Sequence, residues 1–247
     1  MSAAGLLGGF VPSPDAALGD GDGAARHPYH LWRADVAWRF VREGLFSAAH
    51  RIILTEIFMK RIAVYCGSNK GVRPEYAAAA QALVALLARE RIELVYGGGS
   101  VGLMGLVADA TLKHGGHVIG VIPEKLNLRE IIHHGLPDLR IVKDMHERKA
   151  LMAELADGFI ALPGGYGTFE EFFEVLSWSQ LGWHTKPFGL LDIGGFYRSL
   201  LEFLDHTRNE GFIRPPHREL VLVADGPEKI LQRMREFRPP SEVKWVK

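Results

Sequence analysis

Short runs of apolar and β-branched residues alternate with longer amphipathic stretches from Lys60 to the end of the chain. The run Ile160-Ala161-Leu162 is apolar at consecutive positions, which is typical of a strand that helices cover on both faces. The predicted strands are residues 61–66, 92–96, 117–122, 139–142, 158–162 and 187–191, with 220–223 as a further candidate. The predicted helices are residues 74–89, 102–114, 144–156, 168–181, 196–210 and 227–237.

This alternation with short connections predicts an α/β fold in a single domain. The expected architecture is a doubly wound, Rossmann-like parallel sheet with right-handed crossovers and helices on both faces. Ligands of such sheets bind outside the carboxyl ends of the strands. The loops that follow the strands are therefore where the chemistry is expected.

Residues 1–58 have a different pattern from the rest of the chain. Residues 1–23 are rich in Gly, Ala, Pro and Asp without hydrophobic periodicity, which is typical of disorder. Residues 29–58 are weakly amphipathic, and a targeting helix is one interpretation of them. The apolar stretch at 6–11 lacks the basic residues that begin a signal peptide. We hypothesise that residues 1–58 are a dispensable, poorly ordered or loosely helical extension and that residues 59–247 form the catalytic domain.

Composition narrows the classes of partner. The 247 residues suffice for one sizeable core, and Lys plus Arg equals Asp plus Glu at 29 each. The balance predicts neither nucleic acid nor an acidic membrane as a partner. Cys66 is the single cysteine, so no internal disulfide can form, and a cytoplasmic location is expected. No apolar run approaches the roughly 18 residues that span a bilayer.

Two glycine-rich loops follow predicted strands, one at residues 96–105 and one at 162–168, and a shorter Cys66-Gly67-Ser68 turn follows the first strand. Glycines let backbone N–H groups approach an anion, and a helix N-terminus adds favourable partial charge. Tight turns alone also use glycine. Two such loops at one edge of the sheet favour a phosphate or nucleotide crevice.

Gly97, Gly99 and Gly102 match G-x-G-x-x-G between a strand and a helix, with Glu124 about 22 residues beyond. An NAD-dependent oxidoreductase is therefore one alternative, although Glu124 follows a proline outside the strand. No G-x-x-x-x-G-K-[ST] motif occurs, which argues against P-loop phosphoryl transfer. His133-His134 lacks the companions of a metal site, so we assign these residues to a loop and predict no metal.

Helix 144–156 carries an arginine on its apolar face. Asp144 and Glu147 have the spacing of a capping box that starts the helix. Arg148 then falls on the inward face, where a guanidinium is costly unless a carboxylate or phosphate meets it. Lys149 borders the same face. The alternative is that the arginine stem packs while its tip reaches water. The residues predicted to share the inward face are Met145, Met152 and Leu155.

Helix 168–181 supplies the candidate partner. Its predicted core stripe is Phe169, Phe172, Phe173 and Leu176, with Glu171 and Glu174 pointing away from the stripe. Thr168 and Glu171 also have the spacing of a capping box, which is a purely structural interpretation. A second copy of the chain is expected to cover the face that bears Trp178 and Leu181, giving a homodimer.

Residues 163–171 read PGGYGTFEE, residues 145–149 read MHERK and residues 97–105 read GGGSVGLMG. Together these motifs closely resemble the LOG (Lonely Guy) family of cytokinin riboside 5′-monophosphate phosphoribohydrolases over residues 60–213. The resemblance implies a homodimer that uses no metal or cofactor and hydrolyses a nucleoside 5′-monophosphate to an adenine-type base and ribose 5-phosphate. It implies that Arg148 and Glu171 are catalytic. The substrate-binding positions are then Glu130, Lys149, Gly165, Tyr166, Gly167, Thr168, Glu170 and Ser177, to which the glycine loops add Gly164, Gly98, Gly99, Ser100 and Met104.

Residues 131–138 depart from the family pattern, so the details of the substrate loop are not predicted. Cleaving a ribosyl–base bond builds positive charge on the sugar, which a carboxylate at the position of Glu171 stabilises. A non-catalytic nucleotide or cofactor carrier on the same fold stays open as an alternative. The sequence does not distinguish AMP from isoprenylated substrates.

Overall fold

The computed structural model describes residues 59–127 and 132–240. Seven strands form one parallel sheet in the order β4-β3-β2-β1-β5-β6-β7, and the predicted doubly wound α/β fold is confirmed. The strands are β1 (Arg61–Tyr65), β2 (Glu93–Tyr96), β3 (Val118–Pro123), β4 (Asp138–Val142), β5 (Gly158–Ala161), β6 (Phe188–Leu191) and β7 (Val221–Ala224).

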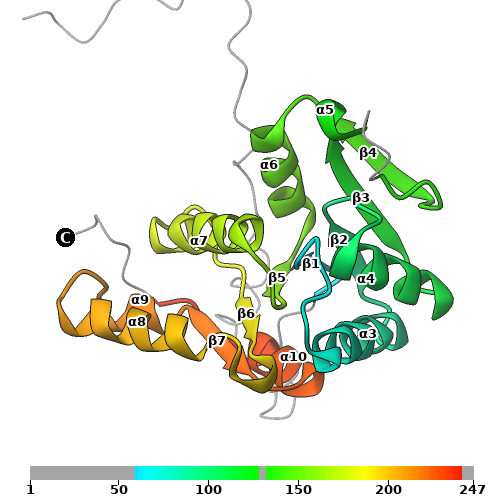
Figure 1. The fold of residues 1–247 in the computed structure, drawn as a ribbon. Coiled ribbons are helices and arrows are strands. Elements are labelled where there is room, and N and C mark those ends of the chain that lie inside the picture. The colour runs from blue at the N-terminus through cyan, green and yellow to red at the C-terminus, as the bar shows by residue number, and fades with distance from the viewer. Residues whose placement is uncertain (1–58, 128–131, 241–247) are drawn as a thin grey trace, which may run out of the picture. The chain divides into compact units, whose positions relative to one another are not determined.

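Helices pack on both faces of this sheet because successive strand residues point to opposite sides. Ile62 and Val64 of β1 face a core built with α3, α4 and α10, whereas Ala63 and Tyr65 face α6, α7 and α8 (Figure 1). The helices are α3 (Pro74–Arg89), α4 (Gly102–Lys113), α5 (Glu124–Asn127), α6 (Met145–Leu155), α7 (Tyr166–Gln180), α8 (Arg198–Asn209), α9 (Pro215–Arg218) and α10 (Pro227–Glu236).

The strand order reverses between β1 and β5, which are neighbours in the centre of the sheet. Strands β2 to β4 extend from one side of β1, and β6 and β7 extend beyond β5. The loops after β1 and β5 meet there, since Gly67 N donates a hydrogen bond of 3.1 Å to Pro163 O. A reversal of this kind opens a crevice at the carboxyl ends of the strands.

The observed boundaries of all predicted strands and helices lie within two residues of the expected ones. The prediction missed the single turns α5 and α9 and the 3₁₀ turn Ile193–Gly195. Elements of three or four residues are too short to show a helical period, so a pattern-based reading cannot detect them.

Two predictions lie outside the described residues: the N-terminal extension, residues 1–58, and the substrate-binding position Glu130. Across the residues that the structure describes, no helix is long and apolar enough to cross a membrane.

Candidate active site

A capping box starts helix α6, as predicted. The Asp144 carboxylate accepts hydrogen bonds from the backbone N–H groups of His146 and Glu147, at 2.9 and 3.0 Å. Glu147 Oε2 accepts from the backbone N–H of Lys143 at 2.7 Å, one residue earlier than the usual reciprocal bond. These bonds determine where α6 begins and therefore place Arg148 against the sheet.

Arg148 and Glu171 form a buried ion pair. Arg148 Nη1 donates to Glu171 Oε1 at 2.7 Å, and each side chain is 9% exposed. Arg148 Nε donates to the backbone carbonyl of Val121, the fourth residue of β3, at 3.1 Å. Two bonds from different nitrogens fix both the position and the plane of the guanidinium. The guanidinium predicted to need an acidic partner therefore has one, and little of the side chain is exposed.

The environment of Glu171 favours the protonated carboxyl more than water does. Burial raises its pKa, and the charge and hydrogen bond of Arg148 oppose that rise without cancelling it. The same burial, with the negative charge of Glu171 nearby, raises the pKa of the Cys66 thiol. Cys66 therefore stays protonated and inert, and Glu171 is the group here whose titration matters.

Lys149 joins α6 to α7 through two further carboxylates. Its ammonium is paired with Glu170 and lies 3.0 Å from Glu174 Oε1. Burial lowers the pKa of Lys149, but the bonds to Glu170 and Glu174 outweigh it and raise the pKa overall. The sequence reasoning named Lys149 and Glu170 but missed Glu174. The i, i+4 spacing of the two glutamates on one helix face was a signal for this role.

The predicted faces of α6 and α7 need correction. Met145 was placed on the inward face and Phe173 in the core stripe, but they are 41% and 40% exposed. Glu171, predicted to point away from the core, is buried beside Phe172 and Val175. Apolar periodicity treats every carboxylate as a surface group, and it cannot foresee one that is neutralised by a guanidinium from another helix.

The N-terminus of α7 is open to a ligand. The helix starts at Tyr166, two residues before the predicted start, and its N-cap is Gly165, with no side-chain cap. The predicted capping box of Thr168 and Glu171 is therefore wrong. A Cβ built on Gly165 or Gly167 would meet nothing within 4 Å, and Tyr166 is 93% exposed. The first N–H groups of α7 can therefore receive an anion.

The N-terminus of α4, by contrast, is closed by the chain itself. Leu103 N donates to Gly67 O at 3.0 Å, and a Cβ on Gly102 would overlap the backbone of Ser68. A pyrophosphate on this loop would need the space that the β1 loop fills. Glu124, the acidic residue of the dinucleotide pattern, is exposed at the start of α5. The G-x-G-x-x-G match is thus explained by close packing, which argues against the oxidoreductase alternative.

The remaining predicted positions lie at different distances from the Arg148–Glu171 pair. Gly98 and Gly99 are buried, with Gly98 packed on β3 and Gly99 bridged to Ile132. Ser177 is exposed and lies six residues beyond Glu171, about 9 Å along the helix. Ser100 and Met104 lie where the β2 loop enters α4. The residues that lie near the Arg148–Glu171 pair and the N-terminus of α7 are Lys149, Gly164, Gly165, Tyr166, Gly167, Thr168 and Glu170.

His133 and His134 lie outside helices and strands, as predicted. His133 Nε2 lies 3.0 Å from Asp109 Oδ1, which ties this loop to α4. Within residues 59–127 and 132–240, no group of three or more His, Cys, Asp or Glu side chains could hold a metal ion.

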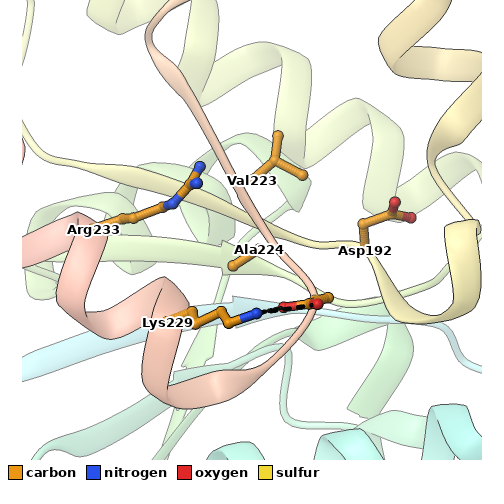
Figure 2. Close-up of a pocket in the computed structure, with 6 residues that line it drawn as sticks. Asp192, Val223, Ala224, Lys229 and Arg233 are labelled. Carbon is orange, nitrogen blue, oxygen red and sulfur yellow. Dashed lines mark hydrogen bonds and ion pairs between the residues drawn. The ribbon is translucent and has the colours of Figure 1, made fainter.

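A cavity of about 300 Å³ lies at the carboxyl ends of β6 and β7 (Figure 2). It is lined by both acidic and basic side chains, and Lys229 Nζ is paired with Asp225 Oδ1 at 2.9 Å. None of the predicted site residues lines it. The residues that line it are Asp192, Val223, Ala224, Asp225, Lys229 and Arg233.

A buried carboxylate–guanidinium pair beside an open helix N-terminus is compatible with an α/β enzyme that acts on a phosphorylated substrate. Comparison with known proteins identifies the family. A family profile described as "Possible lysine decarboxylase" matches residues 104–234. The cytokinin riboside 5′-monophosphate phosphoribohydrolase LOG7 of Arabidopsis thaliana is 51% identical over 185 residues, covering 75% of this chain and 85% of that protein. The probable phosphoribohydrolase LOGL2 of Oryza sativa subsp. japonica is 49% identical over 204 residues, covering 81% and 84%.

The chain therefore belongs to the LOG family of cytokinin riboside 5′-monophosphate phosphoribohydrolases, as its motifs indicated. It is an enzyme of the glycosidase type, a nucleotide phosphoribohydrolase.

Solved structures share the fold at much lower identity. The molybdenum cofactor carrier protein of Chlamydomonas reinhardtii has a TM-score of 0.55 at 21% identity, covering 71% of this chain and 95% of that protein. The molybdenum cofactor binding protein of Rippkaea orientalis has a TM-score of 0.54 at 23% identity with the same coverage. At this identity the likeness concerns the fold alone.

Proposed function

We propose that the chain hydrolyses the N-glycosidic bond of a cytokinin riboside 5′-monophosphate or AMP, releasing the free adenine-type base and ribose 5-phosphate. The observation that carries this proposal is the buried Arg148–Glu171 pair next to the open N-terminus of α7. The names of the plant relatives support the substrate class.

The 5′-phosphate binds at the start of α7. Backbone N–H groups from Gly164 to Thr168 donate to its oxygens, and the partial positive charge of the helix end adds to their attraction. The Glu171 carboxylate, on the second turn of α7, would repel an anion bound at this helix end. The guanidinium of Arg148 reduces that repulsion, because it neutralises Glu171 at 2.7 Å.

The ribose then lies over the first turns of α7, with C1′ beside Glu171. As the bond to the base breaks, positive charge develops on C1′ and the ring oxygen. The Glu171 carboxylate stabilises that charge and orients or deprotonates the attacking water. Arg148 holds Glu171 in place, and Lys149 with Glu170 completes the charged wall of the site. Water is the second substrate, and no step passes through a metal or cofactor.

The adenine-type base extends from C1′ toward the β2 loop. Ser100 and Met104 lie on that side, and we assign Glu130 and Ser177 to substrate binding as well. Gly98 and Gly99 support this loop through their packing on β3 and Ile132.

The working form in this proposal is a homodimer in the cytoplasm, with no nucleic acid or membrane partner. Phe173 is 40% exposed and Trp183 is 65% exposed, and the Trp183 ring lies 6.1 Å from that of Trp178. Phe173 lies on α7 and Trp183 lies three residues after its end. The second copy was predicted to cover the face of α7 that bears Trp178 and Leu181, and exposed aromatic side chains close to that face support the proposal. A free buried Cys66 fits a reducing compartment.

The test is incubation with AMP and with isopentenyladenosine 5′-monophosphate, followed by chromatography for the free base. We expect base release from at least one nucleotide, little release from the riboside that lacks the phosphate, and a loss in Arg148→Ala as large as that in Glu171→Gln. Equal rates with the riboside would refute the phosphate site. Tight nucleotide binding without any base release would instead make the protein a carrier.

A further inference from the structure

The backbone conformation of Gly97 does not require glycine. Two other glycines of the same loop, Gly98 and Gly102, have φ values of 74° and 63°, in the left-handed region that favours glycine. Gly97 is not among the residues with positive φ. Its backbone would therefore accept alanine, and the lack of a side chain there has another cause.

That cause is the guanidinium of Arg148. A Cβ built on Gly97 would overlap Arg148 Nη2 and lie 3.1 Å from its Cζ and 3.5 Å from its Nε. These three atoms are the nearest neighbours of the added Cβ, and all belong to Arg148. The guanidinium thus rests against the bare α-carbon at the end of β2.

The nitrogens of Arg148 show why this contact matters. Nε donates to Val121 O, and Nη1 donates to Glu171. Nη2 has no hydrogen-bond partner among the described residues. It is also not one of the fully buried side-chain atoms that lack a partner, which in the described part of the chain are Tyr96 Oη and His133 Nδ1. Nη2 therefore borders accessible space, and its N–H groups are the ones left for a ligand.

We infer that Gly97 is a positioning residue, whose missing side chain leaves the space that holds Arg148 Nη2 toward the substrate. An alanine there makes the guanidinium give up its bond to Val121 or to Glu171. The far end of a flexible side chain can move, so the variant is expected to fold. This inference rests on the proposed roles of Arg148 and Glu171, and its test separates the two claims.

The experiment is a double-mutant cycle of Gly97→Ala and Arg148→Ala, read by kcat/KM with AMP or a cytokinin nucleotide and by chemical unfolding. Gly158→Ala is the matched control. Gly158 lies at the amino end of β5, and its added Cβ would lie 2.7 Å from the flexible end of Met234, away from the site. The pH profile of each active variant is measured alongside.

We expect Gly97→Ala to lower kcat/KM at least tenfold and to move the acid limb of the profile to higher pH, since Arg148 then lowers the pKa of Glu171 less. In the Arg148→Ala background the same substitution should have no further effect, and Gly158→Ala should keep wild-type kcat/KM. A loss smaller than tenfold, or an equal loss in both backgrounds, overturns the inference.

If Arg148→Ala itself keeps full activity, the proposed function fails, and the unfolding cycle then decides the positioning claim. Gly97→Ala that destabilises the wild-type chain but not the Arg148→Ala chain supports the steric contact. Equal destabilisation in both overturns it.

Discussion

Replacing Glu171 by Gln tests the proposed chemistry most directly. The amide keeps the size of the side chain, and its oxygen can still accept the hydrogen bond from Arg148, so the fold should survive. What disappears is a negative charge that is only 9% exposed and therefore weakly screened by water. The loss should fall on kcat, because charge at C1′ develops in the transition state and not in the bound substrate.

The size of the effect follows from Coulomb's law. Two unit charges about 4 Å apart interact by about 4 kcal/mol at an effective dielectric constant near 20. If a full positive charge develops at C1′, losing the carboxylate charge should slow the reaction about a thousandfold, and for half a charge about thirtyfold. We expect a loss of kcat in that range, measured by release of free base under saturating nucleotide.

The control is Glu154→Gln, which removes an exposed carboxylate near the end of α6 and should leave kcat unchanged. The pH profile gives a second check. Burial raises the pKa of Glu171 above its ordinary 4.5 even though Arg148 opposes the rise, so the active carboxylate should be lost as the pH falls through that raised value. Glu171→Gln should lack this acid limb. A variant that stays within about threefold of the wild-type kcat, under ~1 kcal/mol, would show that Glu171 does not carry the chemistry.

Three further predictions concern stability, the N-terminal extension and assembly. Burial lowers the pKa of His184 to about 4, so the imidazole binds a proton more weakly in the folded chain than in the unfolded chain. The free energy of unfolding should therefore be full above pH 6.5 and fall by up to about 3 kcal/mol toward pH 4. Chemical unfolding of His184→Gln should lack that loss. The chain of residues 59–247 should fold and keep wild-type kcat/KM, and failure to fold would show that residues 1–58 are needed. Trp183→Glu should turn a dimer into a monomer by sedimentation, and an unchanged mass would place the interface elsewhere.

Much of the fold could be predicted from the chain pattern. The apolar runs and helical periods located all seven strands and the six long helices within two residues, because each such element needs a repeated local pattern to bury its surface. The start of α6 could be predicted from Asp144 and Glu147, because capping is a contact between near neighbours in sequence.

The candidate site was only partly predictable. Arg148 stood out as a charge on an apolar face, and Glu171 as a carboxylate after a glycine loop. Their contact spans 23 residues and joins two helices, so sequence could propose it but not establish it. The faces of Met145 and Phe173, and the start of α7, were wrong because packing against other elements decides them.

The glycine loops show most clearly which features could be predicted from the sequence and which depend on folding. The order of residues alone predicts that glycines follow two strands and that a phosphate crevice lies at that edge of the sheet. Which helix end is accessible depends on folding: α7 presents an open N-terminus, the β1 loop closes α4, and Gly97 makes room for Arg148. Local conformation depends on neighbours along the chain, whereas the space around a backbone depends on segments that only folding brings together.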